Sequence, residues 1–316
     1  MWEASAALDP SFAIVHRNLA TAYMHQVSGA DLNRAIAELE KAVSLDRKYA
    51  LHFTELDQLY EQAGVPLEKR MKLFDDNAAV VAQRDDALNR KIALEIALGK
   101  VDEAIQTMTD HTFAVAEGAN LNVSEHWTDA HILRAQAEIQ TKRYDAALAD
   151  LQTAATVPAN LPVGNGAGGV NARAAEIAYW SGVAYKDSGD APKAAESWKL
   201  AVAPPVAGAD RRVGQPVAAG GGAQAYYRGL AYEELGEEAK AQELFRGLVQ
   251  SGQDELKQQP SSVGLLRGRT ANAHYLAGLG DLGLKNQVDA KTELQQAVQE
   301  SPDLLGARTA LASLPN

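Results

Sequence analysis

The segment AYWSGVAYKDSGDAPKAAESW at residues 178–198 recurs as AYYRGLAYEELGEEAKAQELF at residues 225–245, without a gap. Each matching position is displaced by 47 residues, and a third copy at residues 273–294 follows after about 48. The period is too long for a coiled coil and falls in the range of helical repeats, which stack neighbouring units into one core. The matched residues are Gly182 with Gly229, Tyr185 with Tyr232, Gly189 with Gly236, Ala194 with Ala241, and Trp198 with Phe245.

The repeated pattern predicts a pair of antiparallel helices joined by a tight turn. Gly182 is small where two helices cross, and Tyr185 lies three positions later on the same helical face. Gly189 ends the first helix, because glycine readily adopts the left-handed conformation of a helix terminus. Ala194 begins the contact face of the second helix, and Trp198 lies four residues further along it. The third copy has a slightly longer turn, which we expect around Gly283.

The order small residue, aromatic, glycine turn, alanine, aromatic, alanine, proline resembles the tetratricopeptide repeat (TPR). Further copies run in register through Leu19, Phe53, Leu88 and Ala135, which brings the total to seven hairpins. The segment DLLGARTALASL then predicts a single C-terminal capping helix. The resemblance implies an all-α fold, a right-handed solenoid (superhelix) of about seven TPR-like hairpins.

The spacing of the repeats divides the chain into two arms. Hairpins of this type take about 34 residues, but the later repeats take about 47. The extra residues lie between hairpins, at 111–127, 157–173, 203–224 and 251–270. We therefore expect an N-terminal arm at 1–118 and a C-terminal arm of four loop-extended repeats and the capping helix at 119–316. Trp2, Ser5 and Pro10 fit the end of a repeat, so the chain is expected to begin mid-repeat; a lone N-terminal capping helix is the alternative.

Composition excludes several classes of function. The formal net charge of −11 argues against a protein that binds a nucleic-acid backbone, which requires a basic face. The absence of cysteine excludes disulfides, thiolate metal sites and a cysteine nucleophile. No run approaches the roughly 18 apolar residues of a membrane span, and the first residues do not resemble a signal peptide. We expect a cytoplasmic protein with neither a membrane nor a nucleic-acid partner.

The glycine-rich stretch LPVGNGAGGVNARAAEIAYW at 161–180 raises the question of phosphate binding. A phosphate-binding glycine loop needs a preceding strand that aims its amides at the ligand. The residues before Gly164 read instead as a helix end and a proline-containing turn, and no P-loop lysine follows. We interpret the stretch as a connection and expect no nucleotide and no other cofactor.

Aromatic residues recur near the start of the first helices of the last four repeats. In TPR-like hairpins these helices line the concave face, so their side chains can contact a ligand, and aromatic rings can stack on a peptide. The alternative is that one member of each pair packs against the preceding hairpin. The candidate residues are His131, Tyr179, Trp180, Tyr226, Tyr227, His274 and Tyr275.

Catalytic and metal-binding patterns are not found. His126 and His131 lie five residues apart, which does not place two imidazoles on one helical face, and no HExxH motif occurs. The doublets Asp75–Asp76 and Asp85–Asp86 flank a predicted helix, and the second reads as a helix start whose acids complement the helix dipole. The sequence therefore predicts no catalytic residue and no metal ligand.

A second motif indicates a relationship to larger proteins. The segment HTFAVAEG at 111–118, followed by a His- and Trp-containing helix and by Pro158, Asn160 and Leu161, resembles the helical tails of large bacterial proteins with an N-terminal β-rich domain of unknown function. Several members of that group lie near sugar-utilisation genes. The positions that match the group's motif are His111, Phe113, Glu117 and Gly118.

Two functional hypotheses follow. The first is a non-catalytic interaction scaffold that binds a peptide or a partner protein on its concave face. The second is an accessory C-terminal domain of a longer, carbohydrate-related bacterial enzyme, which packs on a β-rich domain of the same chain or mediates dimerisation through the end around Trp2.

Overall fold

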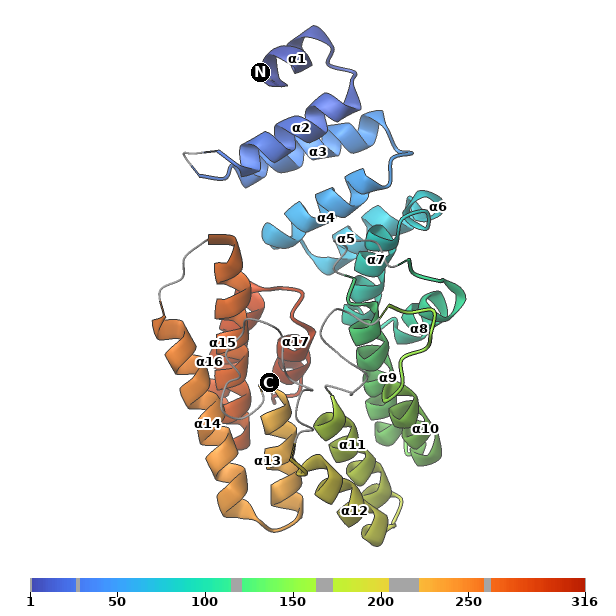
Figure 1. Cartoon of the computed structure of the whole chain (residues 1–316). Coiled ribbons are helices and arrows are strands. Elements are labelled where there is room, and N and C mark those ends of the chain that lie inside the picture. The colour runs from blue at the N-terminus through green and yellow to red at the C-terminus, as the bar shows by residue number, and fades with distance from the viewer. Residues whose placement is uncertain are drawn as a thin grey trace. The chain divides into compact units, whose positions relative to one another are not determined.

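The computed structural model describes residues 2–26, 29–114, 121–162, 173–204, 222–258 and 263–315, with the backbone alone for 263–267. Within these ranges it contains 17 α-helices and no strand (Figure 1). The helices are α1 (Trp2–Leu8), α2 (Ala13–Met24), α3 (Leu32–Leu45), α4 (Leu51–Gln62), α5 (Leu67–Asp75), α6 (Ala78–Val81), α7 (Asp85–Ala97), α8 (Val101–Asp110), α9 (Val123–Gln140), α10 (Tyr144–Ala154), α11 (Ala174–Asp187), α12 (Ala191–Ala201), α13 (Gln224–Glu234), α14 (Glu238–Lys257), α15 (Val263–Gly283), α16 (Gln287–Glu300) and α17 (Leu305–Ala312).

The all-α solenoid predicted from the repeats is confirmed. Seven successive helix pairs run from α2–α3 to α15–α16, and α17 follows them as the predicted single C-terminal helix. α1 precedes the first pair, and the four-residue α6 lies between the aspartate doublets that were expected to flank a helix. α7 begins at Asp85 with both acids of the second doublet in its first turn, as the sequence indicated.

The chain forms two compact units. Unit 1 comprises Met1–Lys100 together with Phe113–Leu121, and unit 2 comprises Val101–Thr112 together with Asn122–Asn316. α7 and α8, which follow one another as the third helix pair, thus belong to different units. The arm boundary that we expect at residues 118 and 119 lies outside the described residues.

The small residues of the repeat are required by close helix crossings. A Cβ atom added to Gly182 would lie 2.2 Å from Nε1 of Trp198, and one added to Gly229 would lie 2.3 Å from Cε1 of Phe245. The aromatic ring of the second helix therefore packs directly on the backbone of the first. Interiors at normal packing density do not absorb such an overlap without displacement of a helix.

The turn between paired helices also follows the sequence, with one exception. Gly189 adopts the left-handed conformation at φ 92°, and the N–H of Asp190 bonds the carbonyl of Tyr185 at 2.8 Å. This bond closes the helix end as in a Schellman motif. In the third copy the left-handed residue is Lys285 at φ 65°, whereas Gly283 is still helical and packs against Phe245.

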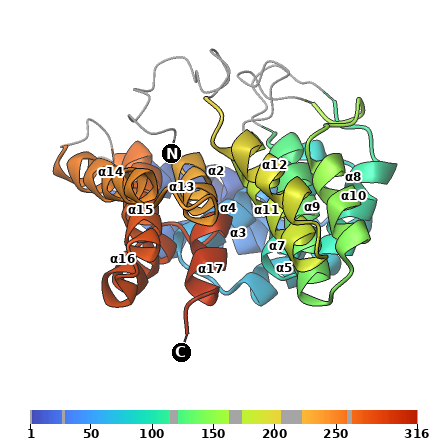
Figure 2. The ribbon, with the colours of Figure 1, turned by 90° about the horizontal axis from the view of Figure 1, so that it is seen from below.

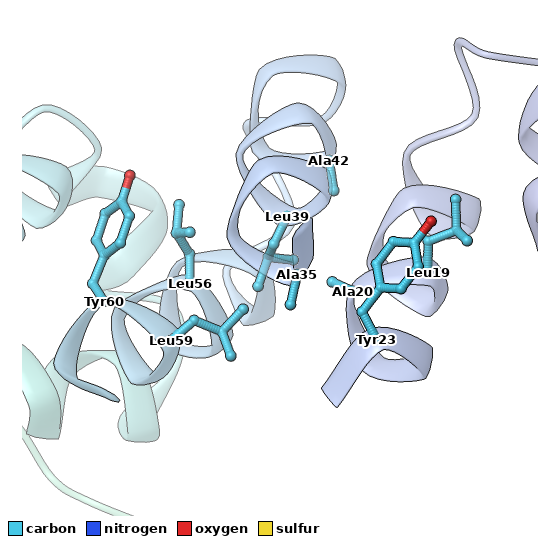
Figure 3. Close-up of a cluster of buried hydrophobic side chains, with 9 residues drawn as sticks. All are labelled: Leu19, Ala20, Tyr23, Ala35, Leu39, Ala42, Leu56, Leu59 and Tyr60. Carbon is cyan, nitrogen blue, oxygen red and sulfur yellow. The ribbon is translucent and has the colours of Figure 1, made fainter. Parts of the chain in front are cut away.

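The first hairpins of unit 1 share one apolar core, formed by the inward faces of α2, α3 and α4 (Figure 3). Tyr23 and Tyr60 lie at the two ends of this core, and the hydroxyl of each bonds a carboxylate outside it. Tyr23 donates to Glu3 at 2.9 Å, and Tyr60 donates to Glu40 at 2.5 Å. The remaining members are Leu19, Ala20, Ala35, Leu39, Ala42, Leu56 and Leu59.

A buried ion pair lies beside this core. Asp57 of α4 and Arg70 of α5 have side-chain exposures of 0% and 1%, and they form two bonds, Nε–Oδ1 at 2.7 Å and Nη2–Oδ2 at 3.0 Å. Arg90 of α7 adds a third bond to Asp57, at 2.5 Å, and a bond to Glu61 at 2.6 Å. Ion pairs of Asp57 therefore connect α4, α5 and α7 in the interior of unit 1.

Candidate functional site

The seven candidate residues of the sequence analysis all lie on first helices of unit 2, namely α9, α11, α13 and α15. They do not share one repeat position. His131 and His274 lie four residues before the small crossing residues Ala135 and Gly278, whereas Tyr179 lies three residues before Gly182. The structure accordingly gives the histidines and the aromatic residues different surroundings.

The two histidines are directed at the second helix of their own hairpin. His131 is 3% exposed, its Nδ1 lies 2.9 Å from Oδ1 of Asp150, and its ring stacks edge-on against Trp127. His274 pairs in the same way with Glu293 at 2.6 Å. Both imidazoles thus connect two helices within a hairpin.

The same contact recurs in unit 1, where Nδ1 of His16 lies 2.5 Å from Glu38. The three carboxylates occupy one repeat position, since each lies three residues after the first buried alanine of the second helix. These residues are Glu38 after Ala35, Asp150 after Ala147, and Glu293 after Ala290. The shared spacing is therefore a sequence signal for such His–carboxylate pairs.

The pKa of Asp150 is set by its two basic partners. Burial alone would raise its pKa, but hydrogen bonds from Arg134 and His131 outweigh burial and lower the pKa to about 2. Arg134 bonds both oxygens of Asp150, at 2.6 and 2.7 Å, and reaches Asp102 of α8 at 3.0 Å. Asp150 therefore helps to hold α8, α9 and α10 together.

The aromatic residues of α11 and α13 form a continuous ladder. Ring centroids lie 5.3 Å apart between Trp180 and Tyr179, 6.0 Å between Tyr179 and Tyr227, and 5.5 Å between Tyr227 and Tyr226. Tyr226 continues to Phe245 of α14 at 5.9 Å. Each ring of α11 and α13 is half-buried, so the ladder both packs the hairpins and presents ring surface to solvent.

An inner hollow of unit 2 is lined by residues from α9, α11, α13, α15 and α17, together with the residue that precedes α11. No second helix of a hairpin lines it, so it marks the inner face of this part of the solenoid. The lining residues are Asp129, Ile132, Leu133, Gln136, Arg173, Glu176, Tyr227, Tyr275, Leu305, Gly306 and Thr309. Of the sequence candidates, Tyr227 and Tyr275 belong to it.

Arg173 organises the polar side of the inner hollow. Its Nη1 lies 2.5 Å from Asp129 of α9, and its Nε lies 2.6 Å from Glu176 of α11. Burial alone would lower the pKa of Arg173, but the two carboxylates outweigh burial and raise it well above the usual value. The backbone N–H of Glu176 also donates to Gln224 of α13 at 3.2 Å, so the ion group joins three first helices.

The tyrosine hydroxyls of the inner hollow remain protonated at neutral pH. Burial, followed by the charge of Glu176, raises the pKa of Tyr227 and of Tyr275 above the usual value, and burial raises the pKa of Tyr226 to about 12. The inner face thus offers ring surfaces and neutral hydroxyls beside a compensated ion group.

Sequence reasoning did not identify Asp129, Arg173 or Glu176, although a signal was present. Asp129 and Glu176 lie 47 residues apart, at the same repeat position, and Arg173 lies three residues before Glu176.

A larger hollow, of about 490 Å³, lies between α13, α14 and α15. Ala225 and Leu244 line it, at the two repeat positions that His131 and Asp150 occupy in the hairpin α9–α10. Apolar side chains thus take the place of the His–carboxylate pair in this hairpin.

The residues of the second sequence motif divide between the two units. The side-chain amide of Asn160 donates to the carbonyls of Met108 and His111, both at 2.8 Å, and so bonds the end of α8 in unit 2. Phe113, in unit 1, is 4% exposed. Glu117 and Gly118 lie outside the described residues.

Among the described residues, no group of three or more His, Asp or Glu side chains has a geometry that could hold a metal ion. His126 and His131 are both on α9, and burial lowers the pKa of His126. No helix in the same described ranges combines the length and the apolar character needed to cross a membrane.

Comparison with known proteins gives similarity to TPR structures. The chain is similar to the crystal structure of YrrB, described as a TPR protein with an unusual peptide-binding site, at 17% identity over 64% of this chain and 90% of that one, with a TM-score of 0.43. It is also similar to a TPR protein from Parabacteroides merdae, at 13% identity over 95% and 97% of the two chains and a TM-score of 0.46.

A third similar structure is the Cut9–Hcn1 hetero-tetramer of APC/C, with 16% identity, 98% of this chain and 51% of that chain covered, and a TM-score of 0.40. No family model matches the chain. At these identities the likeness concerns the fold alone.

Proposed function

We propose that this protein is a non-catalytic interaction scaffold whose unit 2 binds a peptide or a partner protein on its inner face. The observation that carries the proposal is the convergence of five helices on one hollow with tyrosine rings and an ion group on its walls. TPR-like folds commonly serve protein interaction, and a TPR structure similar to this chain is described as having a peptide-binding site.

The proposed ligand contacts are the half-buried tyrosines of the first helices. Tyr179 and Tyr226 expose part of the aromatic ladder, and Tyr227 and Tyr275 line the inner hollow. Trp180 extends the ladder, and we assign it the same role. His131 and His274 keep the first helices in position through their carboxylate partners.

The test is capture of a partner by the immobilised chain from a lysate of its source organism, with quantitative mass spectrometry. The double variant Tyr179→Ala/Tyr226→Ala is expected to lose at least ten-fold of the captured partner while its helical content by circular dichroism is unchanged. Tyr185→Ala is the matched control, since Tyr185 lies on α11 under Lys193 and is not one of the rings of the aromatic ladder described above. Equal capture by the double variant and the wild type would refute the aromatic ladder as the ligand surface, and capture of no partner by the wild type would refute the scaffold function.

A second candidate function is that of an accessory domain in a longer carbohydrate-related protein. Exposed apolar side chains at the start of unit 1 favour it: Leu8 is 89%, Phe12 50% and Ile14 48% exposed. Apolar surface of this kind is commonly covered by another domain or by a second copy of the chain. Light scattering of the wild type and of Leu8→Ser/Phe12→Ser distinguishes these cases: a dimer that the substitutions dissociate indicates self-association, and a wild-type monomer excludes it.

A further inference from the structure

The C-terminal helix α17 is partly buried along most of its length. Ala307 is fully buried, the other residues from Leu305 to Leu311 are half-buried, and Ala312 at the end of the helix is exposed. A helix that only caps the end of a solenoid keeps a polar outer face in water. Both views of the chain place α17 between α15 and α9 (Figures 1 and 2).

One side of α17 packs on the last hairpin. Ala307 forms a buried cluster with Leu294 and Ala297 of α16, and the aliphatic residues on the same side of α17 extend it. This is the contact that the first helix of a following repeat would make, and it accounts for the apolar residues Ala310, Leu311 and Leu314.

The other side of α17 faces the inner hollow. Leu305, Gly306 and Thr309 form one wall of it, opposite residues of α9 and the ion group of Arg173. The space that remains has a volume of about 40 Å³, which accommodates little more than water. The inner face is therefore already occupied, and its occupant is a helix of the same chain.

The fit at Gly306 is specific. A Cβ atom added there would lie 2.4 Å from the hydroxyl oxygen of Tyr275 and 2.7 Å from Cζ of the same ring. The ring thus rests on the bare backbone of α17, and a larger residue cannot take the place of Gly306 without moving one of the two partners.

α17 is also a weak helix by itself. It has eight residues, and isolated helices of this length are marginal in water even without a glycine. The hydroxyl of Thr309 bonds carbonyls of its own helix, and Arg308 bonds the carbonyl of Pro302 just before it. Its helical form therefore depends on apolar packing and on the close fit to Tyr275.

We propose that the inner hollow of unit 2 recognises a short amphipathic helix with a glycine facing Tyr275, and that α17 is the intramolecular occupant of this site. A partner helix of the same kind binds by displacing α17, so the resting chain is self-occluded. This inference rests on the proposed scaffold function and specifies the chemical class of its ligand.

The test uses the full chain and a fluorescein-labelled peptide with the sequence of residues 303–315 as the probe, measured by fluorescence polarisation. The wild-type chain is expected to bind the peptide weakly, because α17 competes at high effective concentration. Gly306→Val in the chain unseats α17 from Tyr275, and the affinity for the peptide is expected to rise at least ten-fold. A peptide that carries Gly306→Val itself is expected not to bind either chain.

Two controls make the outcome decisive. Gly268→Val changes a glycine of α15 that has open space around it, and this variant is expected to bind the peptide like the wild type. Hydrogen exchange of the amides at 305–312 is expected to accelerate in Gly306→Val while α11 and α13 keep their protection. If Gly306→Val loosens these helices as well, Gly306→Ala, which adds the Cβ atom alone, replaces it.

The proposal is wrong if the Gly306 variants gain no affinity for the peptide or bind the substituted peptide equally well. Failure of the peptide test would not affect the scaffold function, provided that Tyr179→Ala/Tyr226→Ala still abolishes partner capture. A gain of peptide affinity without any effect of the tyrosines on capture would instead support the helix site and refute the aromatic ladder as the ligand surface.

Discussion

Substitution of Asp57 gives a sensitive test of how unit 1 is held together. In Asp57→Leu the guanidinium of Arg70 stays buried but loses two bonds from a carboxylate at 2.7 and 3.0 Å. Removal of one partner from a buried pair costs about 3–5 kcal/mol, because the remaining charge has given up its hydration and then also loses its carboxylate. Arg90, at 19% side-chain exposure, can turn to water, so we expect it to add little to this cost.

The double variant Asp57→Leu/Arg70→Met separates charge from packing. It removes both buried charges and keeps approximately the same volume, so it is expected to recover most of the loss and to unfold within about 1 kcal/mol of the wild type. A matched surface control lies nearby on α5: the Lys72–Asp76 pair is 72% and 55% exposed, and Asp76→Ala is expected to cost under about 0.5 kcal/mol.

Hydrogen exchange with mass spectrometry is the suitable assay, because it reports the opening free energy of α4 and α5 separately from unit 2. Tryptophan fluorescence serves as the internal control, since three of the four tryptophans, Trp127, Trp180 and Trp198, belong to unit 2 and should report unchanged stability there. The reasoning fails if Asp57→Leu lowers the opening free energy by less than about 1 kcal/mol, or if the double variant is as unstable as the single one.

Three further predictions concern unit 2. Gly182→Ala places a Cβ atom 2.2 Å from the indole of Trp198 and is expected to cost about 1–3 kcal/mol, measured by urea unfolding followed by tryptophan fluorescence. The pKa of Asp150 is lowered from 3.8 to about 2, so its contribution of roughly 2 kcal/mol is full above pH 5 and is lost as the pH falls towards 2; Asp150→Asn should flatten this part of the stability profile between pH 5 and 2. Asn160→Ala removes two hydrogen bonds to the end of α8 and is expected to cost about 1–2 kcal/mol, with faster exchange in α8 as the readout and unchanged exchange in α13 as the check.

The hairpins were predictable because their contacts repeat with the sequence. Gly182 meets the aromatic ring of Trp198, 16 residues later, and Gly229 meets Phe245 at the same spacing, so this contact can be recognised in the sequence of both repeats. The turn after α15 begins directly after Gly283, near where the sequence predicts it, but Gly283 itself packs on Phe245 and Lys285 takes the left-handed conformation.

The site was predictable only in part. The aromatic residues of the first helices could be selected because they recur near the start of successive repeats, and the structure brings Tyr227 and Tyr275 into one hollow. Arg173 follows a stretch without periodicity, so its position beside Asp129, 44 residues earlier, depends on how successive hairpins stack. The position of α17 on the inner face depends on the same stacking, because local sequence predicts the helix but not its neighbours.

The division of the chain into units has a consequence for how this protein can be varied. The chain passes between the units three times, after Lys100, after Thr112 and after Leu121, so unit 1 is not one continuous segment. A single recombination crossover cannot transfer either unit whole. A crossover after Lys100 leaves residues 113–121 of unit 1 with unit 2, and one after Thr112 or Leu121 separates α8 from α9, its packing partner within unit 2. Neither unit can therefore be exchanged as one continuous segment. Residues 113–121 belong to unit 1 but are joined at both ends to unit 2, so a change in the length of this segment affects two connections between the units.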